Sequence, residues 1–240
     1  MSVTMNTPGT TQYRRIPDQQ TPALGWQQNP HGTDANAPAL LATAGTTISL
    51  PRDSELHAQD DTASFCYRLI SGCIRTVKLM EDGRRQVGAF LLAGDWLGFD
   101  ALDTHDFAAQ AVTDIVVQRY RRRHVEALTE RHPTMARWLR EMAGRNLRQA
   151  YDRMLLLGRK TASERITTFL LEMAGRQGTE HTVALPMGRG DIADHLGLTI
   201  ETVCRMMAHL RREGTITLDQ RGVVLRDRTA LRNLSAAPRH

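Results

Sequence analysis

The sequence has few lysines, few cysteines and few aromatic residues, and it contains no long hydrophobic run. Only Lys78 and Lys160 are lysine among the 31 basic residues of the 240-residue chain, so its positive charge is almost entirely arginine. Arginine is suited to bidentate contacts with phosphate, carboxylate and guanine. The composition therefore makes a nucleic acid or another acidic partner a hypothesis to test against the motifs.

These absences exclude several classes of protein. Because no run of about 18 apolar residues occurs, we expect no membrane-spanning segment. The opening residues, MSVTMNTPGTTQYRR, lack an apolar core, so we expect no secretory signal. Cys66, Cys73 and Cys204 cannot form a disulfide framework, and no C-x-x-C pair suggests a zinc or iron–sulfur cofactor. Together these features predict a cytoplasmic protein without a metal or other cofactor.

The charge is unevenly distributed along the chain. Residues 1–118 carry 8 basic and 13 acidic side chains, or −5; residues 119–160 carry 12 and 4, or +8; residues 161–240 carry 11 and 9, or +2. The cationic peak contains the run Arg119–His124. Such a run fits either contact with flanking DNA or a solvated or intersubunit face, and we favour the second interpretation.

The first half of the chain divides by composition. Residues 1–45 hold five of the nine prolines and almost no periodic apolar pattern, which predicts a disordered tail. Residues 46–132 alternate short apolar runs with turn residues, which predicts an antiparallel roll or barrel that ends in a short helix over Arg121–Arg131. The roll either holds a ligand or is filled with side chains. The candidate strands are Phe65–Ile70, Cys73–Met80, Gln86–Leu92 and Ile115–Tyr120.

Residues 133–158 predict a long helix, because apolar residues recur with a period of about 3.6 from Thr134 to Leu157. The apolar stripe is wide, so we expect one side to pack on the roll and the other on a second copy of the chain. The alternative is an entirely intramolecular core. The residues predicted for the dimer contact are Met135, Leu139, Met142, Leu147, Ala150, Met154 and Leu157.

Residues 159–240 have the pattern of a winged helix-turn-helix, which makes the whole chain an α+β protein. A capping box at Thr161–Glu164 begins one helix, and Arg189–Leu196 and Thr199–Glu213 predict two more, joined at Gly197 and with Thr199 as the N-cap. Short strands are expected at Val183–Leu185, Ile216–Leu218 and Val223–Leu225, the last two as a wing. The core of the motif is expected from Ile192, Ala193, Leu196, Val203, Met207 and Leu210.

The second helix of this motif carries residues that can read bases. Glu201 and Arg205 are four residues apart and therefore share a helix face. Glutamate accepts a hydrogen bond from cytosine N4, and arginine donates two to guanine O6 and N7. The alternative is an exposed salt bridge between the two side chains. We favour DNA reading because the turn, the cap, the buried face and the wing agree.

Three segments give the chain a resemblance to the CRP/FNR superfamily of bacterial transcription regulators, over roughly residues 45–232. They are Gly94–Gly98 (GDWLG), Thr161–Arg165 (TASER) and Leu185–Arg205 (LPMGRGDIADHLGLTIETVCR), and they are most similar to the FixK branch. The resemblance implies a cyclic-nucleotide-binding-like β-roll, a dimerisation helix and a winged helix-turn-helix. It also implies a regulator that is not an enzyme and that activates microaerobic, respiratory or nitrogen-fixation genes.

The same resemblance implies partners and contacts. The chain is expected to bind a TTG…CAA palindrome in double-stranded DNA as a homodimer, and to contact RNA polymerase through the loop Gln177–Thr182. Glu201 and Arg205 occupy the family's base-reading positions. The residues expected to bind DNA are Arg189, Thr199, Ile200, Glu201, Thr202 and Arg205.

The chain departs from the family's sensing sites. No arginine is present for a cyclic phosphate in Leu97–Asp100 or Asp106–Val112, so we expect no cyclic nucleotide. The N-terminal cysteine cluster of oxygen-sensing members is missing, and Cys66 and Cys73 are interpreted as buried fillers. One alternative is a roll that senses haem or 2-oxoglutarate; another is a cupin-like enzyme fused to a DNA-binding module, for which no metal-ligand pattern is present. The candidate haem ligands are His57, His105, His124 and Cys66.

Cys204 lies between the residues that read bases, where family members usually carry a small residue. A thiol that faces the groove beside Arg205 is open to oxidation. An anionic sulfinate at this position would face DNA phosphate and weaken binding. Redox control through Cys204 is therefore a hypothesis, and an inert small residue is its alternative.

Overall fold

The computed structural model describes residues 39–42, 44–99, 103–219 and 222–236. Residues 1–38 of the predicted tail, which spans residues 1–45, lie outside these ranges. Its C-terminal end differs from the prediction, because Ala39–Ala42 form the short helix α1. Leu41 is buried against Tyr120 and Val125, so the tail prediction extends too far.

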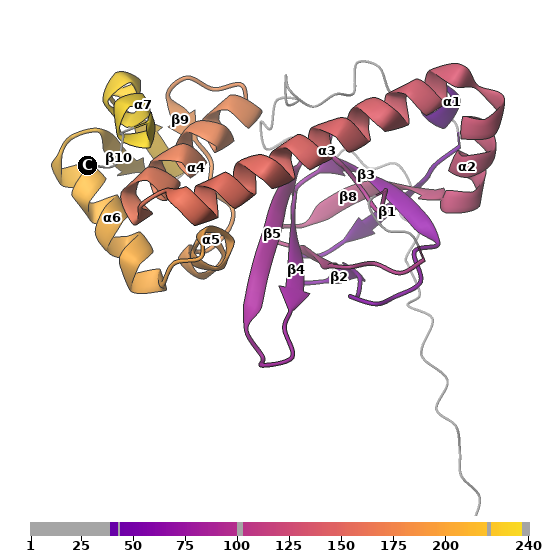
Figure 1. Ribbon diagram of the computed structural model, residues 1–240, viewed down its shortest axis with the longest axis horizontal. Helices are drawn as coiled ribbons and strands as arrows, with labels where there is room; N and C mark the ends of the chain where they lie inside the picture. The colour runs from indigo at the N-terminus through magenta and orange to yellow at the C-terminus, as the bar shows by residue number, and fades with distance from the viewer. Residues whose placement is uncertain (1–38, 43, 100–102, 220–221, 237–240) are drawn as a thin grey trace, which may run out of the picture.

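Two antiparallel four-stranded sheets form the predicted roll (Figure 1). Their strand orders are β1-β8-β3-β6 and β2-β7-β4-β5. Four of these strands are not among the candidate strands; β7, for example, reads Ala-Ala-Gln-Ala, and alanine is depleted in strands. The bounds are Thr46–Leu50 for β1, Glu55–His57 for β2, Phe65–Ser71 for β3, Cys73–Leu79 for β4, Arg85–Leu92 for β5, Trp96–Leu97 for β6, Ala108–Ala111 for β7 and Ile115–Arg121 for β8.

Apolar side chains from both sheets fill the roll. These side chains form the hydrophobic core between the two sheets. The main contributors are Ile48, Leu56, Tyr67, Leu69, Ile74, Leu97, Ala109, Ala111, Ile115 and Val117.

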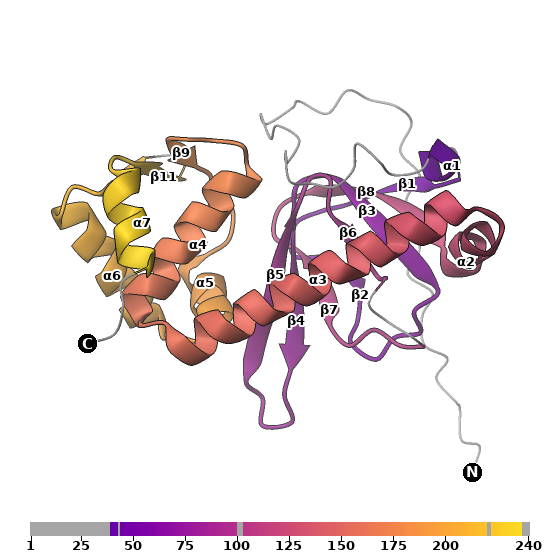
Figure 2. The ribbon, with the colours of Figure 1, turned by 45° about the horizontal axis from the view of Figure 1, so that its top comes forward.

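Two helices follow the roll, α2 (Arg122–Arg131) and α3 (Pro133–Arg159). His132 is extended between them, as expected for a residue that precedes proline. The helix α3 runs along the roll and reaches the winged domain, so it connects the two ends of the molecule (Figure 2). No helix among the described residues is long and apolar enough to cross a membrane.

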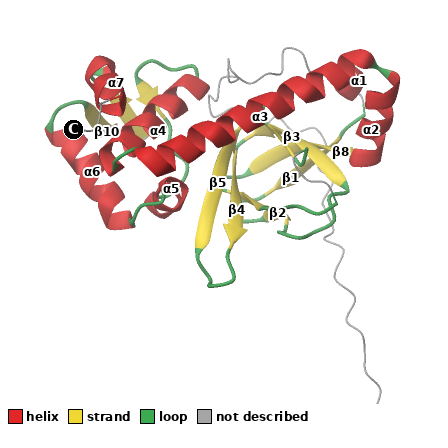
Figure 3. Ribbon diagram, viewed as in Figure 1, coloured by secondary structure: helices red, strands yellow, loops and turns green. Residues whose placement is uncertain are grey.

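The winged domain contains the remaining helices of the described residues (Figure 3). The predicted capping box is present, since the Thr161 amide donates to the Glu164 carboxylate at 2.5 Å and the Glu164 amide donates to the Thr161 hydroxyl at 3.4 Å. The last helix, α7, was not expected from the sequence. The bounds are Ala162–Arg176 for α4, Thr182–Val183 for β9, Arg189–Leu196 for α5, Ile200–Arg212 for α6, Ile216–Asp219 for β10, Gly222–Leu225 for β11 and Arg228–Ala236 for α7.

Candidate nucleic-acid interface

The turn between α5 and α6 has the geometry of a helix-turn-helix motif. Gly197 ends α5 with φ 60° and ψ 46°, the left-handed conformation that glycine adopts at no steric cost. Thr199 then caps α6, because its hydroxyl oxygen accepts a hydrogen bond from the Thr202 amide at 3.2 Å. The predicted turn and N-cap are confirmed, and both helices begin and end within one residue of the expected positions.

One face of α6 is buried and the opposite face is exposed. The buried residues of the motif are those predicted: Ile192, Ala193, Leu196, Val203, Met207 and Leu210. The exposed face of α6 carries Ile200, Glu201, Cys204 and Arg205. The packing of α5 under α6 therefore leaves these four side chains in contact with solvent.

Glu201 and Arg205 are both available to a ligand. Among the ion pairs of the described residues, none joins Glu201 to Arg205, so the salt bridge that the i,i+4 spacing allows is not formed. Hydrogen bonds from the backbone amide of Glu201 and from the Thr199 hydroxyl lower the pKa of the Glu201 carboxyl. The face therefore presents one carboxylate acceptor and one guanidinium donor one helical turn apart.

Thr199, Thr202 and Arg189 lie at helix N-termini. The hydroxyls of Thr199 and Thr202 are 3.1 Å apart, so both take part in the cap of α6. Arg189 is the first residue of α5 and is half-buried. Backbone N–H groups at helix N-termini favour phosphate oxygens, which fits the contacts expected of these residues.

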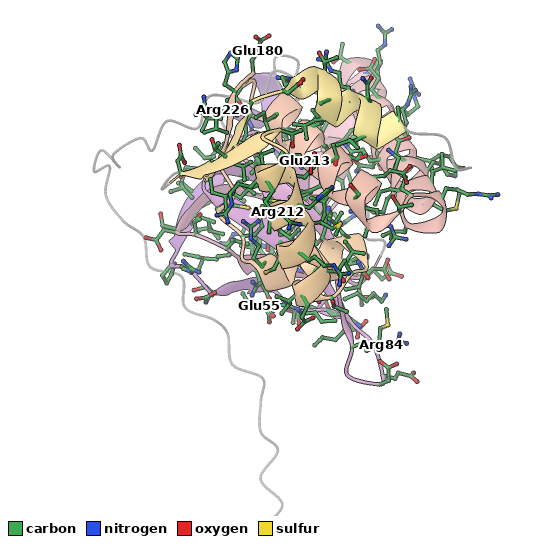
Figure 4. The ribbon with its side chains drawn as sticks, turned by 90° about the vertical axis from the view of Figure 1, so that its left-hand side faces the viewer. Glu55, Arg84, Glu180, Arg212, Glu213 and Arg226 are labelled. Carbon is green, nitrogen blue, oxygen red and sulfur yellow. The ribbon has the colours of Figure 1, made fainter. Side chains whose placement is uncertain are left out.

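The wing lies beside this motif. β10 pairs with β11 from Ile216↔Leu225 to Asp219↔Gly222, and β11 also pairs with β9. A Cβ on Gly222 would lie 2.1 Å from the Val183 carbonyl oxygen, so the close approach of the two strands requires glycine. Figure 4 views this end of the molecule, with Arg212 as the last residue of α6 and Glu213 directly after it.

The loop Gln177–Thr182 has a defined conformation. The side-chain amide of Gln177 donates to the Ala184 carbonyl oxygen at 2.8 Å and accepts from the Ala184 amide at 2.9 Å. Arg228 Nη1 donates to the carbonyl oxygens of two loop residues, both at 3.1 Å. Glu180, at the top of Figure 4, is exposed on this ordered loop.

The residues predicted for dimerisation divide into two groups along α3. Met135 and Met142 are buried, and Leu139 packs beside them, in a cluster with Tyr120 and other residues of the same chain. Leu157 packs against the winged domain. Met135 and Met142 are therefore covered within the protomer, whereas Leu139 and Leu157 are half-buried, and the prediction that these four residues form the dimer contact stays a prediction. The predicted residues that remain exposed are Leu147, Ala150 and Met154, and the exposed stripe also contains Tyr151 and Leu155.

Three arginines of the cationic run Arg119–His124 contact the roll. Arg119 and Arg121 lie over the Phe65 ring, with Cζ 4.5 and 5.6 Å from its centroid. Arg122 donates to the Ala63 carbonyl oxygen at 2.6 Å and also to that of Gly98. These arginines therefore hold the strand β3 and the segment after β6 to the start of α2.

The side chains considered as haem ligands lie in the roll, except His124. His57 and His105 stack with ring centroids 3.6 Å apart, whereas His124 lies on α2. Cys66 and Cys73 are buried, as predicted, and burial raises the pKa of the Cys73 thiol to about 12. Within the described ranges, no group of three or more His, Cys, Asp or Glu side chains converges as metal ligands.

Comparison with known proteins identifies both halves of the chain. Residues 47–132 match the cyclic nucleotide-binding domain family, and residues 164–234 match the Crp-like helix-turn-helix domain family. The nitrogen fixation regulation protein FixK of Azorhizobium caulinodans is 41% identical over 225 residues, which cover 90% of this chain and 91% of that protein. The transcriptional activatory protein AadR of Rhodopseudomonas palustris is 40% identical over 76% of this chain and 78% of its own.

The fold also agrees with a solved relative. The structure of FixK2 from Bradyrhizobium japonicum superposes with a TM-score of 0.78 and 43% sequence identity, and the match covers 82% of this chain and all of that one. The match therefore includes the roll, α3 and the winged domain.

Proposed function

Because this chain belongs to the CRP/FNR family of transcription regulators, we propose that it binds a TTG…CAA palindrome in double-stranded DNA as a homodimer. The observation that carries this proposal is the exposed, unpaired arrangement of Glu201 and Arg205 on α6. Glu201 accepts from cytosine, and Arg205 donates to guanine. Thr199, Thr202 and Arg189 contact phosphates from the helix N-termini, and Ile200 contacts a neighbouring base.

Operator binding by the purified protein tests this proposal. Arg205→Ala is expected to weaken binding to a TTG…CAA duplex by about 1 to 3 kcal/mol and to relax discrimination at one base pair. Arg52→Ala removes the same charge from an exposed site on the roll and is expected to leave affinity and discrimination unchanged. Unaltered base preference in Arg205→Ala would contradict the base-reading role.

We infer that the homodimer forms through the exposed stripe of α3. Leu147, Tyr151 and Met154 are each more than half exposed and follow one another at spacings of four and three residues. This is the spacing of a coiled-coil seam, which two copies bury against each other. Activation fits the ordered loop Gln177–Thr182, which presents a fixed surface to RNA polymerase. The FixK proteins, named for nitrogen fixation regulation, support control of that class of genes.

The proposed regulator acts without a cyclic nucleotide. The segments Leu97–Asp100 and Asp106–Val112, where the family places the arginine that pairs with a cyclic phosphate, contain no arginine. We expect cAMP and cGMP to leave operator affinity unchanged. An absorption spectrum of the purified protein tests the haem alternative, since a Soret band would favour haem.

Cys204 offers a route to redox control. Its thiol is exposed on the face of α6 that carries Arg205. Oxidation by peroxide to a sulfinate adds negative charge where DNA phosphate approaches, so binding weakens. Cys204→Ser is expected to bind operator with or without peroxide. Equal peroxide sensitivity in Cys204→Ser and wild type would remove this role.

A further inference from the structure

The roll contacts the helix-turn-helix motif directly, through β5 and α5. One hydrophobic cluster contains residues of both, including Val87 and Phe90 of the roll and Phe169 of the winged domain. The Phe90 ring lies 4.9 Å from the ring of His195 on α5 and 6.1 Å from that of Phe169. His195 Nδ1 lies 3.1 Å from the Val87 carbonyl oxygen and donates to it when Nδ1 carries the proton. The contact therefore has an apolar centre with a buried hydrogen bond.

Charged side chains border this centre, and we refer to four of them, Arg75, Arg85, Asp191 and Asp194, as the charge clamp. Arg85 donates to Asp194 Oδ2 from Nε at 2.8 Å and from Nη2 at 2.5 Å, and its Nη2 also lies 2.9 Å from Asp191 Oδ1. Arg75 Nη1 lies 3.0 and 2.9 Å from the two carboxylate oxygens of Asp191. The sheet of the roll therefore supplies both cations, and α5 supplies both anions.

The clamp combines burial with paired charge. Asp191 is only 7% exposed, so the loss of its cations would leave a nearly buried charge without a partner. Gln86, next to Arg85 on β5, adds a hydrogen bond from Nε2 to the Asp194 carbonyl oxygen at 2.5 Å. Such a network resists separation of the two surfaces more than an isolated surface pair does.

The clamp and the DNA face are on different helices. All clamp contacts from the winged domain come from α5, whereas Glu201 and Arg205 are on α6 and exposed while the clamp is closed. The clamp is thus compatible with DNA binding. In a dimer, two recognition helices must reach half-sites about one helical turn of DNA, roughly 34 Å, apart. A fixed orientation of α5 and α6 relative to the roll restricts the separations that the pair can reach.

We propose that Arg75, Arg85, Asp191 and Asp194 are positioning residues that fix the recognition helix on the roll and thereby select the spacing between operator half-sites. The proposal rests on the proposed function as a dimeric DNA-binding protein. Loss of the clamp lets the winged domain sample more orientations. Affinity for operators with the matched spacing then falls, because the winged domain must be ordered when it binds DNA. Operators with mismatched spacings lose less affinity relative to the matched one, because the freer domain can reach them.

Operators with the matched spacer and with spacers one base pair longer or shorter test the proposal. Arg85→Gln and Asp194→Asn are expected to lower affinity for the matched spacer by about three- to tenfold and to reduce the preference for it. The double variant should be no worse than the more affected single variant, because both remove the same pair. Arg84→Gln is the matched control, since Arg84 is the neighbouring residue, projects from the hairpin tip and pairs with Asp82 (Figure 4).

Two outcomes would overturn the clamp. If Arg85→Gln and Asp194→Asn have the same operator affinity and spacer preference as Arg84→Gln, the ion pairs of the clamp do not position α6. If they bind operator more tightly than wild type, the clamp opposes DNA binding. Amide hydrogen exchange without DNA gives a separate readout. Arg85→Gln should accelerate exchange in β5 and α5 but not in the remote β1–β8 pair. If wild type fails to bind operator, the proposed function fails, whereas unchanged exchange in Arg85→Gln refutes the clamp itself.

Discussion

The two halves of α3 cover their apolar residues differently. In the N-terminal half, Met135, Trp138 and Met142 are buried against the roll, and the Trp138 ring meets those of Trp96 and Phe99 edge to face at 5.1 and 5.7 Å. In the C-terminal half, one side packs on the winged domain and the other remains exposed. Its exposed apolar residues are Leu147, Tyr151, Met154 and Leu155. One continuous apolar stripe is thus covered by the roll in one part, covered by the winged domain in another, and exposed in a third.

This comparison makes the exposed stripe the part of α3 for which we propose the contact with a second copy. An isolated apolar residue on a surface is ordinary, but four large ones within nine residues of one helix form a contiguous patch. In the N-terminal half, by contrast, Met135, Trp138 and Met142 are already buried within the protomer. Substitutions in the two halves should therefore affect different equilibria, association in one half and folding in the other.

The largest expected effect comes from Met154→Asp. Two carboxylates would be buried in the seam of each dimer, so the dissociation constant of the dimer should rise about a thousandfold, or about 4 kcal/mol. The folded protomer should be unaffected because Met154 is 61% exposed in it. Sedimentation measures association, and operator binding should fall with it.

Gln149→Asp is the matched control, since Gln149 is an exposed polar residue on the same helix. It introduces the same charge outside the apolar stripe and should leave the dimer intact. A dimer of undiminished affinity in Met154→Asp would show that the exposed stripe is not the seam.

The next effect comes from Met142→Ala in the covered half. Removal of a buried side chain leaves a cavity, and the free energy of unfolding should fall by about 2 to 4 kcal/mol. Association per folded protomer should not change. Urea denaturation measures the first quantity and sedimentation the second. Met154→Ala should weaken association and leave the free energy of unfolding nearly unchanged. An equal decrease in the free energy of unfolding in the two variants would contradict the difference between the halves.

The sequence predicts most of this fold where the signals are local. The capping box at Thr161, the turn at Gly197, the cap at Thr199 and the helix spans depend on neighbouring residues, and the structure has each of them. The buried and exposed faces of α6 follow from the same periodicity. This is why the base-reading candidates Glu201 and Arg205 could be identified before the structure.

Contacts between distant residues could not be predicted in this way. Arg75 and Asp191 are 116 residues apart, and neither position differs in sequence pattern from an ordinary exposed charge. Likewise, the periodicity of α3 gives the width of its apolar stripe but not the surface that covers each part, so Met135, Leu139 and Met142 could not be separated from Met154. The Arg75–Asp191 ion pair and the surfaces that cover α3 both depend on how the roll, α3 and the winged domain pack together.

The smallest effect tests the side of the C-terminal half that packs on the winged domain. Arg153 of α3 donates to the His195 carbonyl oxygen at 3.2 Å, and burial, followed by the charge of Arg153, lowers the pKa of His195 from 6.5 to about 3. The unfolded chain therefore binds a proton below about pH 6.5 that the folded chain rejects until about pH 3. In this window stability rises with pH, and acidification costs about 1.4 kcal/mol per pH unit.

His195→Gln removes this titration while its side-chain amide can still donate to the Val87 carbonyl oxygen. Between pH 7 and pH 5.5, wild type should lose about 1 to 2 kcal/mol more unfolding free energy than the variant. Asp95, whose pKa burial raises, contributes with the opposite sign, but it is present in both proteins and cancels in the difference. Equal acid sensitivity would mean that His195 is protonated in the folded state. The exposed stripe of α3 does not contain His195. Acid should therefore lower the free energy of unfolding and leave the association of folded protomers unchanged.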